Sequence, residues 1–123
     1  MKAIVTGGAG FIGHHLVSHL VSNGWYVHII DNLSTGTMDN LEGIQPDMFE
    51  LHNIDLSIDS IPDINNIEAI YHLASPVAVE ESLENPSKYE MGIITASQNL
   101  IDWACKNGVS SFIAASTAAV YGE

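Results

Sequence analysis

The chain has 123 residues, of which 46% are hydrophobic and 15% are charged. This composition is typical of one folded domain and differs from that of a disordered chain. Fifteen acidic residues oppose three lysines, arginine is absent, and the formal net charge is −12. Such a charge repels phosphate backbones and anionic lipid, so neither nucleic acid nor a membrane is an expected partner. A bound anion would have to be held mainly by backbone dipoles.

The single cysteine and the absence of long apolar runs bear on the compartment. Cys105 has no partner for an internal disulfide, and we expect it to be a half-buried, unreactive thiol. No apolar run approaches the ~20 residues of a membrane span, and no signal peptide is recognisable. The expected location is therefore the cytoplasm.

The first 24 residues predict a strand, a glycine-rich turn and a helix. Residues 3–5 form a short apolar run that is followed, after Thr6, by glycines, which is typical of a strand buried in a parallel sheet. "SNG" then supplies a helix stop, with Gly24 at C′. The apolar stripe of the intervening helix is Phe11, Ile12, Leu16, Val17, Leu20 and Val21.

The remaining elements repeat this alternation. Further strands are predicted at residues 25–31, 48–55, 69–74 and 110–116, and residues 32–47 are predicted to be mostly loop with one short helix. Asn85 followed by Pro86 predicts the start of a long helix that ends near Asn107. We therefore predict a single α/β domain over residues 1–123, a Rossmann-like, doubly wound parallel sheet of about five strands.

The glycines of "TGGAGFIG" lie where a phosphate can bind. After a parallel strand, the N–H groups and dipole of the following helix face the crevice beyond the strand's carboxyl end. The spacing assigns a tight turn to Gly7, access to a pyrophosphate to Gly10 and close packing of helix on strand to Gly13.

Two acids at strand ends extend this hypothesis. Asp31 ends the second predicted strand, where it can accept the hydroxyls of an adenosine ribose and repel a 2′-phosphate. NAD is therefore favoured over NADP. Asp55 ends the third strand and could reach the adenine edge, although a simple turn acid is an equally good interpretation.

With these motifs in place, the whole chain resembles the extended short-chain dehydrogenase/reductase family, the NAD-dependent sugar epimerases and dehydratases. Besides "TGGAGFIG", the resemblance is carried by "DNLSTG", "IDL", "YHLAS", "SLENP" and "ASTAAVYGE". It implies cofactor contacts at Phe11, Ile12, Asp31, Asn32, Ser34, Asp55, Leu56, Leu73, Ala74 and Ser75, in addition to the glycines. It also matches Thr117 to the hydroxyl residue that hydrogen-bonds the reacting sugar oxygen.

The chemistry implied by the resemblance is transient oxidation of a nucleotide-sugar. A tyrosine phenolate removes a sugar hydroxyl proton while hydride passes to NAD, and in epimerases the hydride returns to the other face. That tyrosine belongs to a Y-x-x-x-K motif, and none of Tyr26, Tyr71, Tyr89 and Tyr121 has lysine four residues later. We therefore expect this chain to be the N-terminal part of a longer enzyme, without the substrate domain. Alone, it should bind NAD weakly and should not catalyse the reaction. We also expect it to self-associate as a homodimer or a larger species.

Residues near the fifth strand bear on the subclass. Dehydratases and decarboxylases of the family carry acidic residues where this chain has Ala118 and Ala119, so an epimerase or a reductase is favoured. Ile93 replaces the usual asparagine near nicotinamide and sugar, which leaves substrate identity open. A non-catalytic nucleotide-binding module is the alternative from another class.

The histidines do not predict a metal site. His15 and His19 share a helix face, but no glutamate follows His15 to complete H-E-x-x-H. His72, in "YHLA", is predicted to be a structural hydrogen-bonding residue rather than a base. We accordingly expect no metal.

Overall fold

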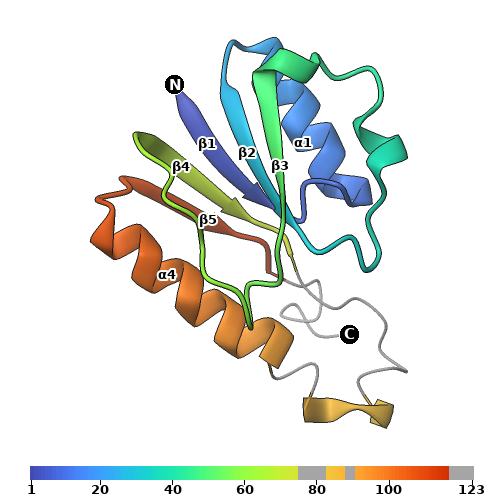
Figure 1. The fold of residues 1–123 in the computed structure, drawn as a ribbon, viewed down its shortest axis with the longest axis vertical. Helices are drawn as coiled ribbons and strands as arrows, with labels where there is room; N and C mark the ends of the chain where they lie inside the picture. Colours follow the sequence, from blue (N-terminus) through green and yellow to red (C-terminus); the bar gives the residue numbers. More distant parts are fainter. Residues whose placement is uncertain (75–82, 88–90, 117–123) are drawn as a thin grey trace.

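The computed structural model describes residues 1–74, 83–87 and 91–116. Five parallel strands form one sheet in the order β3-β2-β1-β4-β5 (Figure 1). The strands are β1 (Lys2–Thr6), β2 (Tyr26–Asp31), β3 (Phe49–Asn53), β4 (Ile67–His72) and β5 (Ser111–Ala114). Each lies within or close to its predicted range, and the predicted fold class is confirmed.

Helices cover both faces of the sheet. α1 (Phe11–Ser22) packs on one face and α4 (Ala96–Lys106) on the other (Figure 1). Alternate β2 residues separate the two cores, because Ile29 packs with α1 residues and Ile30 with α4 residues. Burial on both faces explains why β1 and β2 are almost continuously apolar.

The connections depart from strict alternation of strand and helix. Between β2 and β3 lie only two short 3₁₀ helices, η1 (Met38–Leu41) and η2 (Pro46–Met48), much as predicted for residues 32–47. Residues 54–66 cross from β3 to β4 without a helix. Buried Leu56 and Ile64 anchor this crossover to the α4-side core.

The helix predicted from Asn85 onward is only partly as expected. Pro86 and Ser87 are helical, but a π-helical turn, η3 (Met91–Thr95), precedes α4. α4 ends at Lys106, and Gly108 adopts a positive φ of 65°. The predicted C-terminal end is therefore confirmed, whereas the predicted length of regular α-helix was too great.

Two predictions of burial were wrong. Phe11 and Ile12 are 78% and 70% exposed, so the apolar stripe of α1 begins only after its first turn. Cys105 is exposed rather than half-buried. The predicted stop at Gly24 is confirmed, because its φ of +85° is the left-handed conformation of a C′ glycine.

The described residues contain no helix with the length and apolar character that crossing a bilayer requires. The described region therefore offers no α-helical membrane span.

Gly13 sets how closely α1 approaches the end of β1. A Cβ on Gly13 would overlap the carbonyl oxygen of Gly7. The close packing assigned to this glycine is thus present, although its contact is the turn after β1 rather than the strand.

We expect Gly13→Ala to lower the free energy of unfolding by at least ~2 kcal/mol, because the overlap outweighs the ~1 kcal/mol by which alanine favours a helix. The matched control is Gly10→Ala, whose Cβ would lie 3.2 Å from the same oxygen at a permitted φ of −79°. Urea denaturation of both variants tests this expectation. Equal stabilities would contradict it.

Candidate cofactor site

The glycine loop between β1 and α1 is shaped by backbone contacts. Gly7 has a φ of +71° and donates its N–H to the carbonyl of Ile30 at 2.8 Å. A Cβ there would also lie 2.9 Å from the Ala74 nitrogen. The positive φ and the short Cβ distance both require glycine, and they confirm the tight turn predicted at Gly7.

The N-terminus of α1 has free donors. Gly10 is its N-cap, no side chain among the described residues caps the helix, and no acid lies in its first turn. Intrahelical geometry leaves the amides of Phe11, Ile12 and Gly13 without helical acceptors. These N–H groups and the helix dipole form a positive end that a phosphate can approach over Gly10. Within the described part of the chain, only the Gly7 oxygen would contact a Cβ at this position.

Asp31 ties this loop to the end of β2. Its Oδ2 accepts the N–H of Ala9 at 3.0 Å, and its Oδ1 accepts the N–H of Leu33 at 2.8 Å. The residue is only 8% exposed, so it is neither a helix cap nor a solvated loop acid. Each carboxylate oxygen keeps a second lone-pair direction, so the two loop hydrogen bonds leave acceptor capacity for a ribose.

Sequence reasoning did not identify three residues that hold the loop from the other side. Gly36 lies against Ala9, where a Cβ would be 2.8 Å from backbone atoms. The Thr37 N–H and the Asn40 side-chain amide both donate to the Ala9 carbonyl, at 3.1 and 2.8 Å. The final glycine of "DNLSTG" was the available signal for this contact.

The predicted adenosine contacts differ in how accessible they are. Asn32 and Ser34 are exposed and form a turn in which Asn32 Oδ1 accepts the Ser34 N–H at 3.1 Å. Asp55 accepts both the N–H and the hydroxyl of Ser57, so it organises a turn after β3. Leu56 is 5% exposed and packs in the core, which leaves only its backbone for a ligand contact.

Thr6 and His72 join the carboxyl ends of β1 and β4. The N–H groups of Leu73 and Ala74 both donate to Thr6 Oγ1 at 3.1 Å. With both lone pairs used, the hydroxyl donates to His72 Nδ1 at 2.6 Å. His72 Nε2 therefore carries the ring proton and donates to Ser97 of α4 at 3.1 Å.

This network gives His72 the structural role predicted from the sequence. Burial lowers its pKa below the ordinary value, which favours the neutral ring that the network requires. Leu73 and Ala74 are thereby fixed beside the glycine loop. The predicted contacts at Ser75 and Thr117 lie outside the described residues.

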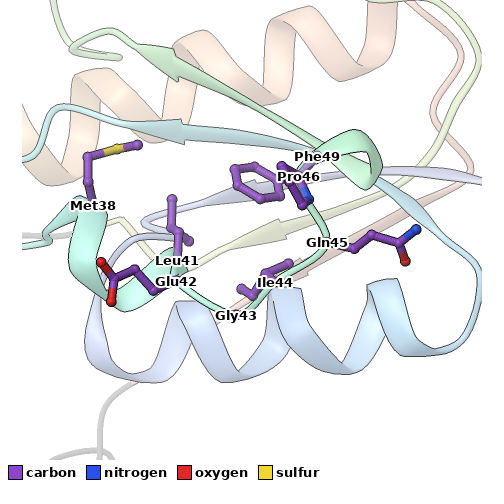
Figure 2. Close-up of a pocket in the computed structure, with 8 residues that line it drawn as sticks. All are labelled: Met38, Leu41, Glu42, Gly43, Ile44, Gln45, Pro46 and Phe49. Atoms are coloured by element: carbon purple, nitrogen blue, oxygen red, sulfur yellow. The ribbon is translucent and has the colours of Figure 1, made fainter.

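Two surface hollows lie apart from these contacts. One, of about 420 Å³, is lined largely by apolar side chains between η1 and β3 (Figure 2). The other, of about 470 Å³, lies between the crossover and α4. None of the predicted cofactor contacts lines either hollow.

The sheet order, the glycine turn and the acid at the end of β2 define a dinucleotide-binding Rossmann-type domain. The sequence model of the NAD dependent epimerase/dehydratase family matches residues 3–123, and the chain belongs to this family. The family is NAD-dependent, which agrees with the predicted coenzyme.

Relatives and solved structures support the same assignment. The chain is 34% identical to a UDP-glucose 4-epimerase of Dictyostelium discoideum, covering 99% of this chain and 38% of that protein. It is 35% identical to UDP-N-acetylglucosamine 4-epimerase from Methanobrevibacter ruminantium M1, with a TM-score of 0.88 over 99% of this chain and 39% of that one. An NAD dependent NDP-hexosamine 5,6-dehydratase of tunicamycin biosynthesis is 30% identical, with a TM-score of 0.84 over 98% and 38% of the two chains.

These coverages show that the chain spans well under half the length of the relatives it matches. The family assignment covers residues 3–123. The activity of the longer proteins is a separate question.

The Thr6 hydroxyl can be tested by two substitutions. Thr6→Val keeps the shape of this fully buried side chain but leaves the Ala74 N–H and His72 Nδ1 without their partner, which should cost roughly 2–4 kcal/mol. The Leu73 N–H would keep its hydrogen bond to the Thr6 carbonyl, at 3.2 Å. Thr6→Ser keeps the hydroxyl and should cost about 1 kcal/mol through the lost methyl group. Equal losses in chemical denaturation would show that the hydrogen bonds are unimportant.

His72 should make stability depend on pH. Because its folded pKa lies below the unfolded value of 6.5, the unfolded state binds more protons in the acidic range. This contribution is fully present above pH 6.5 and is lost as pH falls from there through the folded pKa. The urea midpoint should therefore fall less between pH 7.5 and 5.5 in His72→Gln than in the unsubstituted chain, and an identical fall would contradict this role.

Proposed function

We propose that this chain is the cofactor-binding part of an NAD-dependent nucleotide-sugar epimerase. The observation that supports it most is the uncapped N-terminus of α1, held behind a glycine turn that Asp31 anchors. The match to the epimerase/dehydratase family and the 4-epimerases among the similar proteins favour this class. The nucleotide-sugar is the proposed substrate of the longer enzyme, not of this chain alone.

The residues of the site fit a dinucleotide. Amides of the first turn of α1 would neutralise the diphosphate, and the absence of a Cβ at Gly10 gives it access. Asp31, Asn32 and Ser34 lie where the adenosine ribose would bind, and the carboxylate would repel a 2′-phosphate. Asp55 and the backbone of Leu56 would border adenine, while Leu73, Ala74 and Ser75 would lie along the cofactor toward nicotinamide.

The chemistry would be divided between cofactor and protein. NAD, when bound, supplies a reversible hydride acceptor for a sugar carbon. Thr117 would orient the sugar by a hydrogen bond and share negative charge that develops on its oxygen. The sequence has no tyrosine followed four residues later by lysine, so we expect this chain to bind NAD without catalysing epimerisation.

Two alternative functions can be distinguished from an epimerase by experiment. Ala118 and Ala119 lack the acidic groups of the family's dehydratases, yet the similarity to a hexosamine dehydratase keeps that class as the second candidate. A purely nucleotide-binding role is the third. Pairing the 123-residue chain with the C-terminal part of a 4-epimerase relative would separate them, because only an epimerase half should restore sugar inversion. Self-association remains part of the proposal and is tested by sedimentation.

Calorimetric titration should detect NAD binding and NADP binding that is at least about ten-fold weaker, because Asp31 is buried and anionic. Asp31→Asn should reduce this preference. Asp39→Asn is the control: it removes the same charge from exposed Asp39 in η1, and both affinities should stay unchanged.

Gly10→Ala should weaken NAD binding with little change in thermal stability. A preference for NADP, or full NAD affinity in Gly10→Ala, would contradict the proposed site.

A further inference from the structure

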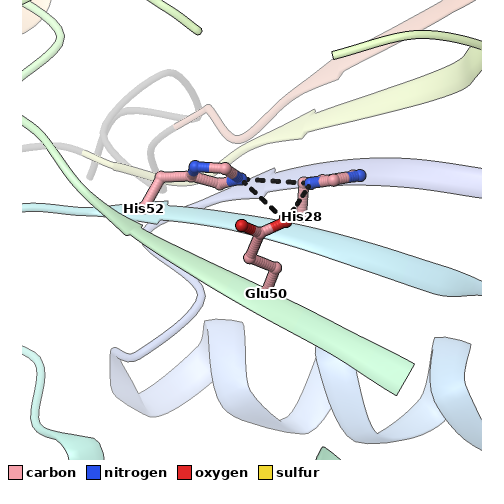
Figure 3. Close-up of side chains that lie close together, drawn as sticks. All are labelled: His28, Glu50 and His52. Carbon is pink, nitrogen blue, oxygen red and sulfur yellow. Dashed lines mark hydrogen bonds and ion pairs between the residues drawn. The ribbon is translucent and has the colours of Figure 1, made fainter. Parts of the chain in front are cut away.

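A cluster of three side chains lies on the other face of the sheet from α1. Glu50 and His52 alternate along β3 and so project from the same face, and the strand register places His28 of β2 directly opposite Glu50 (Figure 3). None of the three is a predicted contact of the cofactor site.

The three ligand atoms have the separations of a metal's coordination shell. His28 Nδ1 lies 3.1 Å from His52 Nε2, and Glu50 Oε2 lies 3.7 and 3.9 Å from these two nitrogens. A triangle with these sides has a point about 2.1 Å from all three atoms, which matches Zn–N distances of about 2.0–2.1 Å and Zn–O distances of about 2.0–2.2 Å. That point lies in the plane of the three atoms, so a tetrahedral ion with a fourth ligand would require Glu50 to approach the two imidazoles by a few tenths of an ångström.

We propose that His28, Glu50 and His52 bind a divalent transition-metal ion of the zinc type, which links the edge strand β3 to β2. Two imidazoles and one carboxylate suit zinc, nickel or copper better than magnesium or calcium. Three protein ligands leave a fourth position for water. This site departs from the sequence-based expectation of no metal.

Charge and burial favour entry of a cation without excluding water. The Glu50 side chain is 57% exposed and that of His52 is 16% exposed, so the position opens to solvent at the sheet edge. Burial, His52 and Lys2 lower the pKa of His28, whereas Glu50 raises it. A neutral ring is the form that binds metal. The carboxylate of Glu50 and the net charge of −12 attract the ion.

The second ring nitrogen of His28 limits the affinity for the metal ion. His28 Nε2 is buried, and the described residues provide it no hydrogen-bond partner. When Nδ1 binds metal, the ring proton must reside on Nε2, where it stays unpaired. Zinc-binding histidines usually donate that proton to a carboxylate or carbonyl. We therefore expect weaker binding than at a structural zinc site.

Calorimetry of the metal-stripped chain tests the proposal. We expect one equivalent of Zn²⁺ to bind and to raise Tm by at least about 5 °C at saturating excess, an effect that a chelator reverses. Mg²⁺ at the same concentration should change neither quantity. A similar rise with Mg²⁺ would mean that cations only screen the acidic surface, and it would overturn the proposal.

Single substitutions locate the ion. Glu50→Gln and His52→Gln should each weaken Zn²⁺ binding by at least about ten-fold, because even outer-shell partners change metal affinity that much. His19 is exposed on α1, so His19→Gln is the matched control and should leave the affinity for Zn²⁺ unchanged. Loss of binding in His19→Gln alone would place the ion on the His15/His19 pair and overturn the proposal.

Cobalt provides a measurement that does not depend on the stability of the variants. Co²⁺ bound to the unsubstituted chain should show the intense visible absorption of four-coordinate cobalt, and Zn²⁺ should displace it. Weak bands of the six-coordinate, water-rich ion would contradict the proposed ligand set.

Discussion

A buried carboxylate at the end of β2 holds the glycine loop in position. Asp31 accepts N–H groups from Ala9 and Leu33, and so joins the segments on either side of the expected ribose position. A buried charge is tolerable only when such hydrogen bonds replace water. The same group can therefore stabilise the loop and carry out the proposed selection of the coenzyme.

The second support of the site comes from a hydroxyl rather than a charge. Thr6 uses both of its lone pairs and its proton, which joins the end of β1 to β4 and, through His72 and Ser97, to α4. Asp31 at the end of β2 and Thr6 at the end of β1 thus hold the strand ends on both sides of β1 by hydrogen bonds to neutral groups. Support by neutral hydrogen-bonding groups suits a chain with three lysines and no arginine.

Periodicity and turn chemistry predicted the fold because the core strands are apolar on both faces and the stops at Gly24 and Gly108 are local signals. The glycine turn and Asp31 were recognisable for the same reason. Other features depend on tertiary contacts that spacing does not encode: the exposure of Phe11, the approach of Gly36 to Ala9, and the Thr6 network. The His28–Glu50–His52 cluster was missed because it depends on the register of β2 and β3.

The proposed diphosphate site at the first turn of α1 consists of peptide N–H groups. Peptide N–H groups do not titrate in the physiological range and carry no reactive amine. Reagents that acylate lysine should therefore leave the proposed diphosphate recognition intact, and moderate acidity or alkalinity should alter it only through neighbouring groups. Natural substitutions would weaken this binding mainly by adding a larger side chain at the turn or by distorting the main chain. Charge-reversing substitutions elsewhere on the surface would have little effect on it.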